Sequence, residues 1–150
     1  MKVKILIADD EPHIRKIISL LLMQEGYEVK SVANGKEAVE ETAVFQPDVI
    51  LLDQQMPVMT GLEALEKIQA VRPNQVILLI TACGTISLAV DAVKKGAYDF
   101  IEKPFDNDDL LLKVKRAVEH SRLKGELRQL KKRLGEGERP IIGGEGGLRT

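Results

Sequence analysis

The sequence has 150 residues, of which 44% are hydrophobic and 30% charged, so one domain with a buried core is expected. Its formal net charge of -1 gives no general attraction to nucleic acid or to an anionic membrane. A single cysteine, Cys83, excludes an intramolecular disulfide and suits a reducing compartment. No apolar stretch is long enough to cross a bilayer and the first residues do not resemble a signal peptide, so we expect a cytoplasmic protein.

Five short runs rich in leucine and β-branched residues predict β-strands, and helical patterns separate them. The strands are expected at Val3–Ala8, Glu28–Val32, Val49–Leu52, Val76–Ile80 and Tyr98–Ile101. The central runs lack polar alternation, which is typical of strands covered on both faces. Alternation of strand and helix predicts a doubly wound parallel α/β sheet with right-handed crossovers and helices on both faces.

Two of the helical segments show an apolar face in their spacing. In the first helix this face consists of Ile14, Ile17, Ile18, Leu21 and Leu22. In the fourth helix it consists of Ile86, Ala89, Val90 and Val93. Gly26 and Gly96 stand where helices are expected to end, and Asn34-Gly35 marks a turn before the second helix.

The last helical pattern runs from Asn107 to about Leu134, which is roughly twice the length of an average helix. Its distal part carries leucines spaced four, three and four residues apart, as in a coiled-coil seam: Leu123, Leu127, Leu130 and Leu134. We expect residues 122–135 to form a dimerising linker, since an isolated helix of this length is marginal in water. A solvated, fraying extension is the alternative.

Beyond this helix, residues 136–150 are rich in glycine and predict a flexible tail. The many basic residues of the last helix lack aromatic neighbours and a recognition fold, so direct binding to nucleic acid is not indicated.

Carboxylates follow two of the predicted central strands. Asp9 and Asp10 come directly after Ile5–Ala8, and Asp53 comes directly after Val49–Leu52. Open α/β sheets bind ligands at the carboxyl ends of their strands, so these acids should meet at one edge. Carboxylates there favour a hard cation such as Mg²⁺, which commonly binds together with a phosphate group.

The residue types at this edge suit phosphoryl transfer. Asp53 is the candidate nucleophile, because a carboxylate can form an aspartyl phosphate, and Asp9 and Asp10 could hold Mg²⁺ beside it. Lys103 could neutralise phosphate charge, and Thr81 could donate a hydrogen bond to a phosphate oxygen. Taken singly, Asp10 could complement a helix dipole and Asp53 could be a turn residue. Thr81 could likewise cap a helix, and Lys103 could be a solvated lysine.

Four short motifs occur in order along the chain. They are Ile7-Ala8-Asp9-Asp10-Glu11, Leu51-Leu52-Asp53 with Met56-Pro57 and Gly61, Thr81-Ala82, and Lys103-Pro104-Phe105. Together they resemble the receiver domain of two-component response regulators, over residues 1–121. The resemblance implies a flavodoxin-like (βα)5 sheet with strand order 2-1-3-4-5, here with an extended C-terminal helix.

The resemblance also implies roles for individual residues. A histidine kinase phosphorylates Asp53 with Mg²⁺ as cofactor. Asp53 and Asp10 ligate the metal directly, Asp9 acts through water, and Gln55 contributes its backbone carbonyl.

Further residues in this resemblance form the switch. Lys103 pairs with the phosphate, and its peptide bond to Pro104 is cis. Thr81 moves toward the phosphoryl group while Phe100 turns inward into the space that Thr81 leaves. The sequence alone equally allows Phe100 to be a static core aromatic.

Three other side chains, those of Gln54, Gln55 and Cys83, are expected to flank the phosphorylated aspartate and to influence hydrolysis of the acyl phosphate. A redox role for Cys83 is not indicated, since no basic residue adjoins it to lower its pKa.

The function implied is a signalling switch that controls its own dimer or an output domain, in transcription regulation, rather than an enzyme with small-molecule turnover. A free-standing phosphorelay receiver, or one that only docks without being phosphorylated, is an alternative. A Mg²⁺-dependent phosphatase would need an acid at position 55, where Gln55 stands. A flavin-binding module would need small polar residues where Asp9 and Asp10 stand.

The end of the chain, Arg139-Pro140-Ile141-Ile142-Gly143, faintly resembles the beginning of the ATPase domain of sigma-54-dependent activators. No phosphate-binding loop follows it, so we expect the output domain to be missing from this chain.

Overall fold

The computed structural model describes residues 2–82 and 86–137, so Cys83 and the tail from residue 138 onward lie outside the described residues. Five strands and five helices alternate within the described residues. They are β1 (Lys4–Ala8), α1 (Pro12–Gln24), β2 (Glu28–Val32), α2 (Gly35–Phe45), β3 (Val49–Asp53), α3 (Gly61–Val71), β4 (Val76–Ala82), α4 (Ile86–Lys94), β5 (Asp99–Lys103) and α5 (Asn107–Gly137). All strand pairs are parallel, in the order β2-β1-β3-β4-β5. The predicted flavodoxin-like doubly wound fold, with this strand order and a long last helix, is confirmed.

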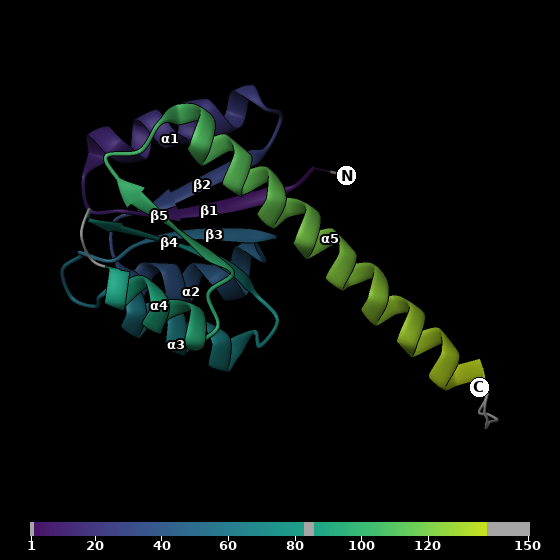
Figure 1. Cartoon of the computed structure of the whole chain (residues 1–150). Coiled ribbons are helices and arrows are strands. Elements are labelled where there is room, and N and C mark those ends of the chain that lie inside the picture. Colours follow the sequence, from purple (N-terminus) through teal and green to yellow (C-terminus); the bar gives the residue numbers. More distant parts are fainter. Residues whose placement is uncertain (1, 83–85, 138–150) are drawn as a thin grey trace.

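Helices cover both faces of the sheet. Figure 1 shows α1 and α5 on one face and α2, α3 and α4 on the other. On the central strand β3, Val49 and Leu51 pack into the first layer, whereas Ile50 and Leu52 pack into the second. All four side chains are fully buried, and burying each contributes about 1.5–3 kcal/mol. A slip of one residue would exchange the two sets, so burial fixes the register of β3 and the place of Asp53 at its end.

Three strands extend further than the sequence predicted, by one or two residues at their carboxyl ends. β3 includes Asp53, β4 includes Thr81 and β5 includes Lys103. Asp53 pairs in register with Ile80, and Thr81 pairs with Glu102. The sequence prediction stopped where the apolar runs stop, but backbone pairing continues through these polar residues. The candidate site residues are therefore held by the sheet itself.

The helix boundaries follow the local signals in the sequence. The predicted apolar face of α1 is confirmed, since Ile18 and Leu22 are fully buried and the other members are partly buried. Asn34 caps α2 by accepting a 2.9 Å hydrogen bond from the backbone N–H of Glu37. Gly26 follows the end of α1 with φ of 91°, a backbone conformation that favours glycine.

The face that α4 turns to the sheet differs from the prediction. Ala89 is 1% exposed and Ala92 is fully buried, whereas Val90 and Val93 are 47% and 46% exposed. The prediction that both valines are buried is therefore wrong. α4 is apolar on most of its circumference, so spacing alone does not select a face. Packing favours the two alanines because small side chains let the helix backbone approach the sheet closely.

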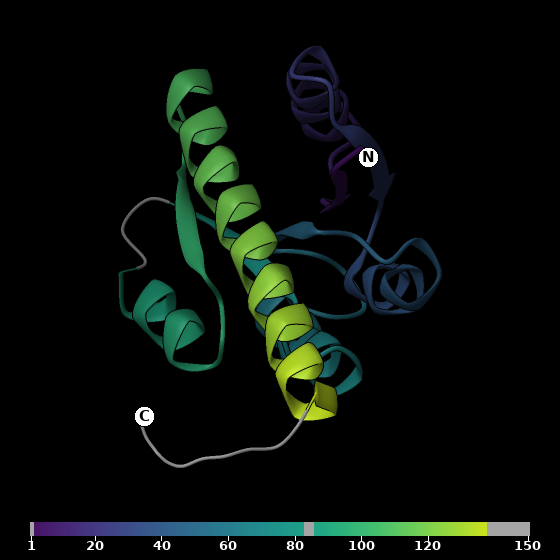
Figure 2. The ribbon, with the colours of Figure 1, turned by 90° about the vertical axis from the view of Figure 1, so that its right-hand side faces the viewer.

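The helix α5 has a buried part and an exposed part. Its first turns pack on the sheet through Leu110, Val114, Ala117 and Val118. The helix then continues beyond the sheet in an unbroken run, as Figures 1 and 2 show. The four leucines of the predicted seam are all 49% to 67% exposed. Among the described residues, no helix is both long enough and apolar enough to cross a membrane.

The first residue of α3 lies very close to the backbone at the end of β3. A Cβ atom added to Gly61 would lie 2.7 Å from the carbonyl oxygen of Asp53 and 2.9 Å from the Cα of Gln54. Backbone atoms at the end of a central strand cannot move aside without breaking its pairing. Glycine at this position therefore allows α3 to begin directly against the segment that carries Asp53.

We predict that Gly61→Ala lowers the free energy of unfolding by about 1–3 kcal/mol, as overpacking in a core does. The measurement is urea unfolding of wild type and variant. Gly125→Ala in α5 is the matched control, because a Cβ there meets nothing within 4 Å. The control should leave stability unchanged or raise it by up to about 1 kcal/mol. Equal losses in the two variants would contradict this interpretation of Gly61.

Candidate functional site

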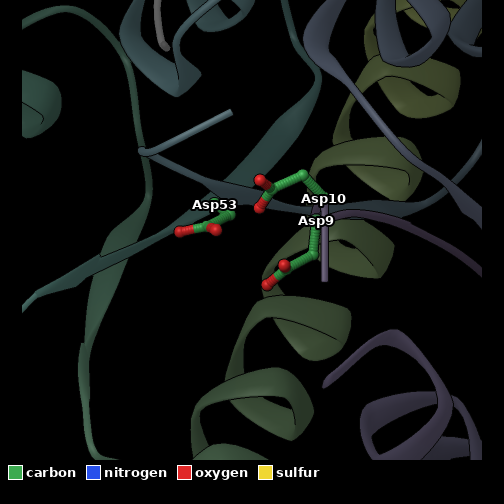
Figure 3. A group of neighbouring side chains, drawn as sticks. All are labelled: Asp9, Asp10 and Asp53. Atoms are coloured by element: carbon green, nitrogen blue, oxygen red, sulfur yellow. The ribbon is translucent and has the colours of Figure 1, made fainter. Parts of the chain in front are cut away.

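Three carboxylates meet at the carboxyl edge of the sheet. Asp9 and Asp10 follow β1, and Asp53 ends the neighbouring strand β3, where Ala8 pairs with Leu52. One carboxylate oxygen from each acid lies within 4.8 Å of the others, and Figure 3 shows this arrangement. Asp9 and Asp53 are buried, whereas Asp10 is exposed. Oxygen ligands gathered in this way are suited to a divalent hard cation.

The side chain of Asp9 is held in a fixed orientation. Its Oδ1 accepts a 2.9 Å hydrogen bond from the backbone N–H of Glu11, and its backbone carbonyl accepts a 2.7 Å bond from Nη1 of Arg15. Its Oδ2 is buried and has no hydrogen-bond partner among the described residues. A buried anionic oxygen without a hydrogen bond is costly, so this atom needs positive charge nearby.

The only protein ammonium group that the structure places against these acids, within the described residues, is that of Lys103. Its Nζ lies 3.3 Å from Oδ2 of Asp53, 3.6 Å from Oδ2 of Asp9 and 4.0 Å from Oε1 of Glu11. Partial burial opposes its charge, but the carboxylates of Asp53 and Asp9 outweigh burial and raise the pKa of Lys103. With 28% of its side chain exposed, Lys103 is an ion-pair partner rather than a solvated lysine.

The surroundings of Asp53 disfavour the ionised form of its carboxyl group. Burial, followed by the charge of Asp9, raises the pKa of Asp53 to about 6. Lys103 and a hydrogen bond from the backbone N–H of Gln55 lower this pKa, but they do not offset the two larger effects. The protein by itself thus supplies less positive charge than Asp53 needs to be fully ionised near neutral pH.

Thr81 and Phe100 lie on adjacent strands of the same site. Thr81 is 1% exposed, and its Oγ1 has no hydrogen-bond partner in the part of the chain that is described. Among the described residues, the hydroxyl of Thr81 therefore does not act as a helix cap. Phe100 pairs in register with Leu79 and packs, half-buried, against the same layer of the core. Because Leu79 and Thr81 share a face of β4, Thr81 and Phe100 are diagonal neighbours on one face of the sheet.

The loops around the site include contacts that the sequence did not indicate. The peptide bond between Lys103 and Pro104 is cis, as the resemblance implied. The carboxamide of Gln54 accepts a 2.9 Å hydrogen bond from the backbone N–H of Leu62 in α3, an engagement missing from the sequence analysis. Glu11 and Arg15 also contribute without having been assigned a role. The Glu11 N–H lies two residues after Asp9, the spacing of an Asx turn, so the sequence held a signal for that bond. The contacts of Arg15 with the Asp9 carbonyl and of Glu11 with Lys103 depend on the fold and have no such signal.

Comparison with known proteins places the chain in a large family. A family model described as "Response regulator receiver domain" matches residues 5–115. "Regulatory protein AtoC" of Escherichia coli (strain K12) is 37% identical over 131 residues, which cover 87% of this chain and 28% of AtoC. "Chemotaxis protein CheY" of Listeria monocytogenes serovar 1/2a is 41% identical over 116 residues, which cover 77% of this chain and 98% of CheY.

A solved structure gives the same result. The crystal structure of NtrX from Brucella abortus matches with a TM-score of 0.83 at 35% identity, covering 95% of this chain and 32% of NtrX. The chain therefore spans less than a third of AtoC and of that NtrX chain, but matches almost all of CheY. Since the family model covers most of the chain, and with it the strand ends that carry the acids and the lysine, the chain belongs to the response regulator receiver domain family of two-component systems.

Proposed function

We propose that this chain is a phosphorylation-dependent switch in which Asp53 accepts a phosphoryl group from a histidine kinase. The observation that carries the proposal is the environment of Asp53. Its side chain is almost fully buried, lies within 4.8 Å of two further carboxylates, and faces the ammonium group of Lys103 at 3.3 Å. Membership of the receiver family supports the same reaction.

Mg²⁺ is the cofactor that we propose for this site. The donor set is made of hard oxygens, and Oδ2 of Asp9 is buried without a hydrogen bond among the described residues, so the residues fit a divalent cation. Asp53 and Asp10 would bind it directly, Asp9 through water, and Gln55 by its backbone carbonyl. When bound, Mg²⁺ would supply positive charge against the carboxylates and the incoming phosphate oxygens.

The transfer itself would use residues of this chain for positioning and charge. A carboxylate oxygen of Asp53 attacks the phosphorus of the kinase phosphohistidine, the P–N bond breaks, and the imidazole leaves with the bonding electron pair. Lys103 already lies beside that carboxylate, where it can compensate the charge of the transferred group. Thr81 would donate its hydroxyl proton to a phosphoryl oxygen, and Phe100 would then turn inward.

Control of an output is the second half of the proposal. We infer a receiver over residues 1–121, a dimerising linker over 122–135, and a tail predicted from 136, whose first two residues the structure assigns to α5. The whole would belong to a longer cytoplasmic transcription regulator of the sigma-54-dependent type. The basis is that, as far as burial is described along α5 (to Leu134), Val118 is the last buried residue and the leucines beyond it are exposed. AtoC and NtrX, which are much longer, match the chain only in part. The match to nearly all of CheY keeps a free-standing receiver as the alternative.

We predict that the wild-type chain gains one phosphoryl group when incubated with Mg²⁺ and acetyl phosphate, whereas Asp53→Asn gains none. Asparagine keeps the shape of the side chain but is not a nucleophile at this step. Intact-mass analysis measures the adduct. Lys103→Gln should retain the acceptor but slow the reaction by about tenfold or more, since it removes the ammonium group that lies 3.3 Å from Asp53. An adduct of equal size on Asp53→Asn would refute Asp53 as the acceptor.

We predict an unusual pH dependence of stability in metal-free protein. The pKa of Asp53 is about 6 in the folded chain and 3.8 as its ordinary value, so the folded state binds a proton more tightly than the unfolded state. This contribution to stability is present below about pH 4 and is lost as pH rises through about 6. The loss should amount to about 1–3 kcal/mol.

The control for this pH prediction is Asp53→Asn, which cannot ionise. The free energy of unfolding of the variant, minus that of the wild type, should grow between pH 4 and pH 7 in urea titrations with a chelator present. Adding Mg²⁺ should raise wild-type stability at pH 7 more than that of the variant. If the free energies of unfolding of the two proteins ran parallel with pH, the pKa of Asp53 would not be raised in the folded chain.

For the linker, we predict that Leu127→Glu combined with Leu130→Glu converts a dimer into a monomer. Charges in an apolar seam oppose pairing of two helices, while both positions are exposed in the single chain and should tolerate the change. Light scattering on the phosphorylated and unphosphorylated chain measures the mass. A double variant that remains dimeric would place the interface on the receiver instead.

A further inference from the structure

The residue directly after Asp53 is held by three hydrogen bonds. The backbone N–H of Gln54 donates to the carbonyl of Ile80 at 2.9 Å, and its own carbonyl accepts from the N–H of Gly61 at 3.0 Å. Its side-chain Oε1 accepts from the N–H of Leu62 at 2.9 Å. Gln54 thus links the end of β3 to both β4 and the first turn of α3.

The first turn of α3 is capped from two different places. Thr60 is the N-cap residue, and it forms a reciprocal capping box with Glu63. The N–H of Leu62 would otherwise lack a partner within the helix, as the first N–H groups of any helix do. Gln54 satisfies it from outside the helix. One cap is therefore local to α3, and the other connects α3 to the segment that follows Asp53.

Gln55 follows Gln54, and its backbone belongs to the proposed metal site. The backbone N–H of Gln55 lowers the pKa of Asp53, and the carbonyl of Gln55 is the proposed ligand of Mg²⁺. Gln55 itself is exposed, so its own side chain contributes little packing to hold it. Its backbone is fixed from its two neighbours, the hydrogen-bonded Gln54 on one side and the buried Met56 on the other.

We propose that Gln54 is a positioning residue for the metal site: its side-chain bond to α3 sets the orientation of the Gln55 backbone. This inference rests on the proposed function of the site, since it concerns the carbonyl that would bind Mg²⁺. The bond between Gln54 and Leu62 is made by protein groups alone, so we expect it to hold the loop ready for the cation.

The experiment compares Mg²⁺ affinity in two variants that both remove a cap from α3. Gln54→Met keeps the length of the side chain but removes the amide acceptor. Thr60→Ala removes the local cap and leaves the Gln54 bond intact. Isothermal titration calorimetry measures the Kd for Mg²⁺, because the chain has no tryptophan to report binding. Hydrogen exchange of the Leu62 amide in metal-free protein, followed by NMR, measures the bond itself.

The Kd for Mg²⁺ should rise about three- to tenfold in Gln54→Met, which corresponds to about 0.7–1.4 kcal/mol. In Thr60→Ala it should rise by less than about twofold. Exchange of the Leu62 amide should be faster in Gln54→Met than in wild type. Equal increases of Kd in both variants, or no increase in Gln54→Met, would overturn the proposal.

Two further measurements distinguish a failure of this proposal from a failure of the variant to fold and from a failure of the proposed function. If Gln54→Met does not fold, exchange of the Leu62 amide in the wild type should slow when Mg²⁺ is added, and an unchanged rate would overturn the proposal. The mass analysis of Asp53 is independent of these measurements. A chain that binds Mg²⁺ but accepts no phosphoryl group would refute the proposed function, while the two Kd values would still decide the role of Gln54.

Discussion

Excess negative charge, partly removed from water, is the constraint on which the rest of this structure depends. Asp9 and Asp53 are buried beside each other, and Asp10 adds a third carboxylate at the rim. Within residues 2–82 and 86–137, Lys103 is the ammonium group placed against them. Such a cluster disfavours the folded chain when no cation is present. It persists because the β-sheet holds it in place, and the same unfavourable energy becomes available to attract a cation and a phosphoryl group.

The hydrophobic core provides the force that keeps the acids together. The central strands β1, β3 and β4 are buried on both faces, so their register cannot change without exposing leucine and isoleucine side chains. Apolar burial, spread over two layers, thereby offsets a local electrostatic cost. Aliphatic residues occupy the interiors of the strands, and the candidate site residues lie at or just after the carboxyl ends of the strands.

The sequence predicts features that follow from the regular alternation of strands and helices, but not hydrogen bonds made by one particular side chain. Asp9, Asp10 and Asp53 were located correctly because strand ends of a parallel sheet must converge. The buried face of α4 was misassigned, since Val90 and Val93 fit the helical period as well as the alanines that pack inward. The bond from Gln54 could not be predicted, because its donor is a backbone N–H whose position depends on where α3 begins. The switch roles of Thr81 and Phe100 stay predictions that rest on the family resemblance.

Because α5 is one continuous helix, a small rotation at its base produces a larger displacement at its far end. At 1.5 Å per residue, the distance along α5 from the buried Val118 to the exposed Leu134 is about 24 Å. Since the helix has no proline between these points, it behaves as a stiff rod, and a tilt of about 5° at its base moves its far end by about 2 Å. Any small repacking beside the strand ends would thereby be enlarged, at the far end of α5, into a displacement larger than the rise of one residue along a helix.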